Sequence, residues 1–247
     1  MTRSTPNFPA HAPAADPDSP RYAIYFAPDA NTLLHRFGSA WLGRDAISGE
    51  VLEQPALDGF DAETQKALTA TARNYGFHAT LKPPFRLKAG LTAEDLMDEA
   101  VRFSADRAAF EINLVARNLS GFLALMQKES KAAMRELAAD CVRDFDPLRA
   151  LPDDAELEKR RAAGLSSQQE LMLQRWGYPY VMNEFRFHMT LSKRIGDDGE
   201  REALLHEILK HGAEAIATPV RIDAISVFRQ ENRTSPFQRL AHFPFGG

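Results

Sequence analysis

In several short stretches of this chain, every second side chain is apolar. A period of two is the pattern of a β-strand, because successive strand side chains point to opposite faces of a sheet. The first such stretch, RYAIYFAP at residues 21–28, predicts a buried strand. Over residues 33–41 the apolar positions recur at helical spacing instead, and Gly43 predicts the end of that helix.

The succession strand, helix, strand, strand occurs twice. In the first copy, YGFHATLKPPFRL precedes a helix at about residues 92–107 and the strand-like runs FEINLVARNL and GFLALMQ. In the second copy, FRFHMTLSKRI precedes a helix at about residues 199–213 and the runs PVRIDAISVF and FQRLAHFPF. Since paired strand runs follow each helix, the pattern disfavours a parallel, doubly wound sheet.

The duplication predicts an α+β fold. We expect two similar lobes with antiparallel sheets and outer helices, related by pseudo-two-fold symmetry, with the histidine motifs facing a central cleft. Residues 1–20, rich in proline and small side chains, predict a disordered leader. Residues 21–127 form the first lobe and 185–247 the second, within one integrated domain. A helical linking segment, 128–184, includes the strongly charged run PDDAELEKRRAAG.

Composition and charge exclude some classes of function. The chain has 247 residues and a net charge of −4, with a mean hydropathy of −0.36. An acidic balance argues against broad binding of long nucleic acids, and no apolar run approaches the roughly 20 residues of a membrane span. Cys141 is the single cysteine, which permits no internal disulfide and favours a cytoplasmic protein. Its helix-like context favours packing over a nucleophilic role.

Each copy places a histidine and a threonine on one strand face, in FHATL and FHMTL. His78 with Thr80, and His188 with Thr190, would meet across a shared cleft if the lobes pair about an approximate two-fold axis. Cleavage of a phosphodiester needs a base and an acid on opposite sides of phosphorus, and histidine serves both roles near neutral pH. The threonine hydroxyls can donate hydrogen bonds to the phosphate oxygens. This chemistry requires no metal and no cofactor.

These motifs resemble the paired HxTx signatures of the two-histidine (2H) phosphoesterase superfamily, which includes cyclic phosphodiesterases and RNA 2′–5′ ligase-like proteins. The resemblance covers roughly residues 21–245. RYAIYFAP, FGSAWLGRD, YGFHATLKPPFRL, CVRDFDPLRA and RWGYPYV resemble more narrowly a bacterial branch labelled as phosphonate metabolism proteins. The resemblance implies catalytic roles for His78 and His188, and phosphate binding by Thr80 and Thr190.

Other side chains are candidates for substrate binding. Lys82 shares the strand parity of His78, and Arg186 and Arg194 share that of His188. Four tyrosines are candidates to line the cleft: Tyr22, Tyr75, Tyr178 and Tyr180. Each tyrosine could instead pack in the core or at its rim, and each lysine or arginine could instead be an ordinary solvent-exposed side chain.

The sequence therefore predicts a metal-independent phosphoric diester hydrolase that opens a cyclic phosphodiester, such as a sugar cyclic phosphate of phosphonate metabolism. An RNA-end 2′,3′-cyclic phosphodiesterase or 2′–5′ ligase-like enzyme uses the same residues, and a non-catalytic module that binds a phosphorylated metabolite is the second alternative. A structural histidine pair and a metal site compete with all three. The exact substrate, the acid and base roles, the oligomeric state and a lid role for the middle helices stay open.

Overall fold

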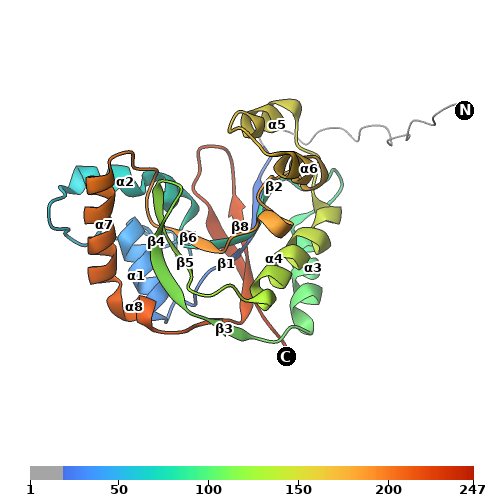
Figure 1. The fold of residues 1–247 in the computed structure, drawn as a ribbon. Helices are drawn as coiled ribbons and strands as arrows, with labels where there is room; N and C mark the ends of the chain where they lie inside the picture. The colour runs from blue at the N-terminus through green and yellow to red at the C-terminus, as the bar shows by residue number, and fades with distance from the viewer. Residues whose placement is uncertain (1–18) are drawn as a thin grey trace, which may run out of the picture.

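A computed structural model describes residues 19–247 (Figure 1). The leader predicted for residues 1–20 lies, apart from its last two residues, outside the described residues. Among the described residues, no helix is both long and apolar enough to cross a membrane.

One antiparallel sheet of seven strands forms the centre of the molecule, in the order β4-β5-β6-β2-β1-β8-β9. A second sheet contains β3 and β7 alone. The predicted α+β class with antiparallel sheets is thereby confirmed. The strands are β1 (Arg21–Phe26), β2 (Ala79–Phe85), β3 (Phe110–Ile112), β4 (Leu114–Leu119), β5 (Phe122–Gln127), β6 (His188–Thr190), β7 (Val220–Ile222), β8 (Ala224–Gln230) and β9 (Gln238–Pro244).

The sheet interleaves the two halves of the sequence. On one side of the β2–β6 contact lie β5 and β4, from the first half of the chain, next to β6 from the second half. On the other side lie β8 and β9, from the second half, next to β1 and β2 from the first. The predicted segments 21–127 and 185–247 describe the repeat in the sequence. In space, each half of the sheet contains strands from both segments.

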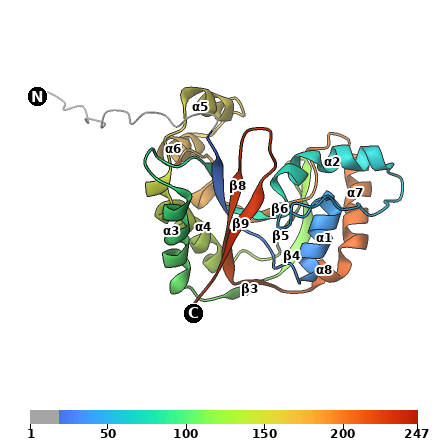
Figure 2. The same cartoon turned by 180° about the vertical axis from the view of Figure 1, so that it is seen from behind.

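Each half of the sheet has its own helices, as Figures 1 and 2 show from opposite sides. Helices α3 and α4 pack against the half that contains β2 and β8, and helices α7 and α8 pack against β4. Helix α1 packs on α2 and α8, and α5 and α6 lie above the α3–α4 side in Figure 1. The helices are α1 (Leu33–Leu42), α2 (Ala62–Tyr75), α3 (Ala93–Ala105), α4 (Ala132–Asp144), α5 (Asp154–Arg161), α6 (Ser167–Trp176), α7 (Asp198–His211) and α8 (Ala213–Ala217), with short 3₁₀ turns at Asp146–Leu148 and Met182–Glu184.

Helix α1 ends at Gly43, as its sequence predicts, and it begins after a threonine cap. The Thr32 side chain accepts a hydrogen bond from the His35 amide, which caps the first turn. The last turn ends at Gly43, whose φ of 74° lies in the left-handed region that glycine adopts without a steric cost. The predicted helices at about 92–107 and 199–213 correspond to α3 and α7.

Helix α1 also contacts both histidine motifs. The Phe77 ring, next to His78, lies directly on Gly38, where a Cβ atom would stand 2.1 Å from Phe77 Cδ1. The Trp41 indole Nε1 donates a 2.9 Å hydrogen bond to the carbonyl oxygen of Leu191, next to Thr190. One helix therefore fixes the residue before the first motif and the residue after the second.

Replacement of Gly38 tests this contact. In a helix interior, Gly→Ala normally stabilises by about 1 kcal/mol through propensity, but here the new methyl group overlaps the Phe77 ring. We expect Gly38→Ala to lower the free energy of unfolding by about 1–3 kcal/mol, the usual cost of overpacking, measured by urea denaturation. Gly196→Ala is the control, since no atom lies within 4 Å of the position that its new Cβ would take. An unchanged or raised stability of Gly38→Ala would contradict the contact.

Candidate active site at the β2–β6 contact

The two histidine motifs lie side by side on neighbouring antiparallel strands. Ala79 of β2 pairs with Met189 of β6, and both side chains are buried in the core. This register places His78 opposite Thr190 and Thr80 opposite His188, on the other face of the sheet. Facing Cβ atoms in such a ladder lie about 4.5–5.5 Å apart, and diagonal neighbours roughly 7–8 Å apart. The two histidines occupy one diagonal and the two threonines the other.

Both imidazoles are oriented by the same backbone contact. His78 Nδ1 lies 2.9 Å from the carbonyl oxygen of Gly76, and His188 Nδ1 lies 2.8 Å from that of Arg186. A carbonyl oxygen only accepts, so Nδ1 carries the proton in each ring and donates it. The neutral ring then has a lone pair on Nε2. For His78, Nε2 lies 3.2 Å from Thr80 Oγ1. Because Nδ1 carries the proton, Nε2 is the atom of each ring that can accept one.

Aromatic side chains surround His78. The Tyr25 ring stacks on the imidazole with a centroid distance of 3.7 Å and an interplanar angle of 21°. The rings of Tyr75 and Phe228 lie farther away, each at 6.3 Å. His188 has a different neighbour, because Phe122 meets its ring edge-on at 5.9 Å. The two halves of the site are therefore similar in backbone geometry but different in their aromatic contacts.

Burial keeps both histidines neutral. It lowers the pKa of His78 to about 4, against the opposing effect of the hydrogen bond to Gly76, and the nearby His188 lowers that pKa further. Burial likewise lowers the pKa of His188 below its ordinary value. An anion between the rings would raise both pKa values, because a negative charge favours the imidazolium form.

A cleft of about 420 Å³ opens over this face of the sheet. Its volume is in the range of pockets that hold a small organic ligand. Four cationic side chains line it: Arg21, Arg160, Lys193 and Arg194. The other lining residues are Tyr25, Thr71, Ala72, Tyr75, Gly76, His78, Thr80, Pro83, Pro84, Phe122, Tyr178, Thr190 and Ser192. His188 lies beside the cleft, with its ring against the lining residue Phe122.

Lys82 does not share the face of His78, and the expectation from strand parity is wrong. Thr80 pairs with Tyr25 of β1 while Lys82 pairs with Ile24, so β2 contains one extra residue between these pairs. This β-bulge reverses the side-chain alternation after Thr80. Lys82 is 1% exposed, and its Nζ donates to the Val142 carbonyl oxygen and contacts Asp146 on the α4 side. Burial lowers the pKa of Lys82 to about 8, and Asp146 partly offsets this effect.

Tyr22 and Arg186 also lie away from the cleft. Tyr22 is buried in the main hydrophobic core, and Tyr25, three residues along β1, lines the cleft in its place. Arg186 precedes β6 and lines a separate shallow pocket with Met126 and Gln127. Of the other predicted candidates, Tyr75, Tyr178 and Arg194 line the cleft and Tyr180 does not.

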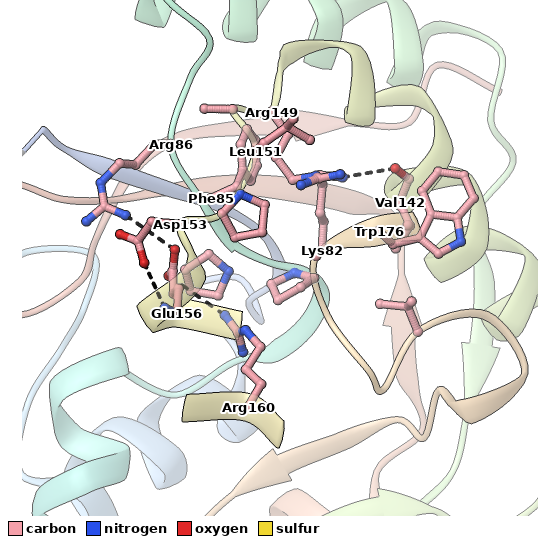
Figure 3. A pocket seen from close by; sticks show the side chains of 16 residues that line it. Lys82, Phe85, Arg86, Val142, Arg149, Leu151, Asp153, Glu156, Arg160 and Trp176 are labelled. Atoms are coloured by element: carbon pink, nitrogen blue, oxygen red, sulfur yellow. Dashed lines mark hydrogen bonds and ion pairs between the residues drawn. The ribbon is translucent and has the colours of Figure 1, made fainter. Parts of the chain in front are cut away.

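A smaller pocket lies behind the Pro83-Pro84 segment, around the Lys82 side chain (Figure 3). It encloses only about 30 Å³, which is room for a water molecule or two and not for a phosphate ester. Its charged side chains largely face one another, as in the ion pair of Arg86 with Glu156 (3.7 Å). We therefore assign it a structural role and place the functional site at the larger cleft.

Sequence reasoning missed Tyr25 and Arg160 as cleft residues. Tyr25 points to the opposite face of β1 from Tyr22, Ile24 and Phe26. That this face borders the cleft follows from the pairing of Tyr25 with Thr80, which the sequence alone does not give. Arg160 comes from the charged run at 152–164, which forms α5 and has no buried residues. No local signal separates Arg160 from its charged neighbours.

Among the described residues, no group of three or more histidine, cysteine or carboxylate side chains is arranged to hold a metal ion. Cys141 is buried in the core, and burial raises the pKa of its thiol. Its surroundings agree with the packing role predicted from the sequence.

The fold and the site together define a class of protein: an α+β protein with two His–Thr pairs on adjacent antiparallel strands. A family model described as "Protein of unknown function (DUF1045)" matches residues 80–238. Since this match spans more than half of the chain, the protein belongs to that family.

Two curated relatives share the name "Ribose 1,5-bisphosphate phosphokinase PhnN". The one from Janthinobacterium sp. (strain Marseille) is 41% identical over 231 residues, which cover 92% of this chain and 51% of the relative. The one from Laribacter hongkongensis (strain HLHK9) is 33% identical over 219 residues, covering 88% of this chain and 50% of the relative. The chain thus spans about half the length of these relatives.

Solved structures give more distant matches. E. coli LigT complexed with 3′-AMP has a TM-score of 0.44 and 11% identity, with 94% of this chain and 100% of that one covered. TT0787 of Thermus thermophilus has a TM-score of 0.45 and 12% identity, with 92% and 98% covered.

The lowered pKa of His78 predicts how stability depends on pH. An unfolded chain takes up a proton at this ring near pH 6.5, whereas the folded protein does so only near pH 4. The free energy of unfolding should therefore fall as the pH falls through this window. Between pH 7.5 and pH 5, the free energy of unfolding should fall in both proteins. We expect the fall to be about 1–2 kcal/mol smaller in His78→Gln than in the wild type, measured by urea titration. Equal losses in the two proteins would contradict a neutral, buried His78.

Proposed function

We propose that this protein is a metal-independent phosphoesterase that hydrolyses a cyclic phosphodiester with His78 and His188 as its acid–base pair. The observation that carries the proposal is the β2–β6 register, which puts each histidine opposite the threonine of the other motif. A phosphate over this face of the two strands would have an imidazole on each side and a hydroxyl beside each imidazole. This is the arrangement that in-line displacement at phosphorus requires.

The proposed reaction uses groups that the site already holds. One neutral imidazole accepts a proton from water at Nε2 as the water oxygen bonds to phosphorus. The bond from phosphorus to one ring ester oxygen breaks, and the other histidine, protonated beside the bound anion, gives its proton to that oxygen. The Thr80 and Thr190 hydroxyls donate hydrogen bonds to the two non-bridging oxygens. The roles of the histidines are interchangeable between the two directions of the reaction.

The proposed substrate is 5-phosphoribosyl 1,2-cyclic phosphate, which links the enzyme to phosphonate metabolism. The matched relatives are named for ribose 1,5-bisphosphate. Addition of water to the 1,2-cyclic phosphate, with cleavage of the bond from phosphorus to O2, yields that bisphosphate. The class of reaction that would consume the product is therefore phosphoryl transfer by a kinase. A cytoplasmic location suits such an enzyme.

The primary test is hydrolysis of a panel of cyclic phosphodiesters with EDTA present. The panel includes 5-phosphoribosyl 1,2-cyclic phosphate and 2′,3′-cyclic nucleotides, the substrates of an RNA-end enzyme. We expect His78→Ala and His188→Ala each to lower kcat by about 10²–10⁴-fold, the usual contribution of a general acid or base. His206→Ala, at an exposed position of α7, is the matched control and should retain activity.

Each outcome of this test separates the alternatives. Activity lost to EDTA would identify a metal site, and preference for 2′,3′-cyclic nucleotides would favour the RNA-end enzyme. Full activity in both histidine variants would refute the mechanism. Tight binding of the cyclic phosphate without turnover in the wild type would indicate a binding module instead.

The threonine hydroxyls can be tested by removal and by conservative replacement. Thr80→Val and Thr190→Val keep the shape of the side chain but lose the donor, and we expect each to lower kcat by about 10–10³-fold. Thr80→Ser and Thr190→Ser keep a hydroxyl and should recover most of the activity. Valine variants with unchanged kcat would show that the threonines do not bind the reacting phosphate.

A further inference from the structure

At one end of the cleft, the segment between α4 and β6 contributes side chains to the lining. Helix α5 contributes Arg160 and the turn after α6 contributes Tyr178. Both lie at the Pro83-Pro84 end of β2, where Arg21 of β1 also lines the cleft. At the opposite end, beyond Thr190, lie Lys193 and Arg194.

Arg160 lies against an aromatic ring and makes only a long ion pair with a carboxylate. Its guanidinium carbon lies 4.7 Å from the centre of the Tyr178 ring, and its side chain is 23% exposed. Its Nε is buried and has no hydrogen-bond partner among the described residues. The Glu156 carboxylate lies 4.0 Å away, beyond hydrogen-bond distance, and the same carboxylate also contacts Arg86 (Figure 3).

The neighbouring arginines, unlike Arg160, donate hydrogen bonds to other side chains of the protein. Arg161, next in the chain, donates hydrogen bonds to Glu158 and Glu170 and faces away from the cleft lining. Arg21 donates through both Nε and Nη2 to the Gln230 side chain. At this end of the cleft, Arg160 thus combines a fixed position with donors that make no hydrogen bond within the part of the chain that the structure describes.

We propose that Arg160 binds a second phosphate of the substrate, separate from the phosphate that reacts between the histidines. This inference rests on the proposed function of the cleft. Guanidinium groups bind phosphate oxygens through paired N–H donors, and the Tyr178 ring holds the guanidinium by a cation–π contact. A cleft of about 420 Å³ has room for a sugar ring between the two phosphates.

The proposal gives the middle segment a role in substrate choice. An enzyme that acts on a sugar carrying both a cyclic and a terminal phosphate must distinguish it from the sugar that lacks the terminal group. A site built for a charged group discriminates strongly against substrates without that group, since its donors are then left unpaired. Arg160 is thus a substrate-binding residue that determines specificity and takes no part in proton transfer.

The test compares two substrates that differ only in the terminal phosphate: 5-phosphoribosyl 1,2-cyclic phosphate and ribosyl 1,2-cyclic phosphate. We expect Arg160→Met to lower kcat/KM for the first about 10–100-fold, the equivalent of one hydrogen bond to a charged group. The second substrate should be hydrolysed as by the wild type. Arg160→Lys should recover part of the loss. The melting temperature of each variant, compared with that of the wild type, checks that the fold is intact.

Arg194→Met is the matched control at the opposite end of the cleft, where the Arg194 side chain is exposed. It should leave the discrimination between the two substrates unchanged. Equal losses on both substrates in Arg160→Met, no loss on either, or a selective loss in Arg194→Met instead would each overturn the proposal.

A binding measurement separates this proposal from the proposed reaction. Calorimetry with ribose 1,5-bisphosphate and ribose 1-phosphate needs no turnover. The wild type should bind the bisphosphate more tightly, and Arg160→Met should remove that preference. Equal affinities of the wild type for the two compounds would overturn the proposal. A retained preference in Arg160→Met would do so as well, whatever the result of the hydrolysis assay.

Discussion

The pairing of Ala79 with Met189 is the contact on which the rest of this site depends. It joins two strands more than a hundred residues apart and sets the register in which each histidine faces the threonine of the other motif. Because strand side chains alternate, a slip of one residue would turn one histidine–threonine pair into the core. The burial of Ala79 and Met189 disfavours such a slip, since it would expose apolar side chains and bury polar ones.

Helix α1 and two backbone carbonyls complete this constraint. The helix meets Phe77 through Gly38 and the Leu191 carbonyl through Trp41, so both strands are held from the core side. The carbonyls of Gly76 and Arg186 fix the ring orientation and tautomer on the cleft side. Burial lowers the pKa of both imidazoles, which favours their neutral form. The site is thereby organised before any substrate binds, which is how electrostatic and acid–base groups contribute most to a reaction.

Local patterns in the sequence predict the helices, the α+β class and the faces of the two histidine strands. These features depend on neighbouring residues alone, as in the alternation in FHATL and FHMTL and the turn at Gly43. Lys82 departs from the same alternation because a bulge precedes it, and the bulge is defined by its pairing with β1. Tyr25 and Arg160 reach the cleft through non-local packing, and the interleaving of the sheet likewise depends on strand pairings far apart in the sequence. The parts of the structure set by distant contacts are therefore those that the sequence pattern does not reveal.

The claim that both histidines contact one phosphate is tested most directly by ¹⁵N NMR. With histidine side chains labelled, the Nε2 resonances of His78 and His188 are followed as inorganic phosphate or vanadate is added at pH 7. The account predicts that both resonances shift with the same dissociation constant, because one anion lies between the two rings. A shift of only one histidine, or of neither while the anion binds elsewhere, would contradict it.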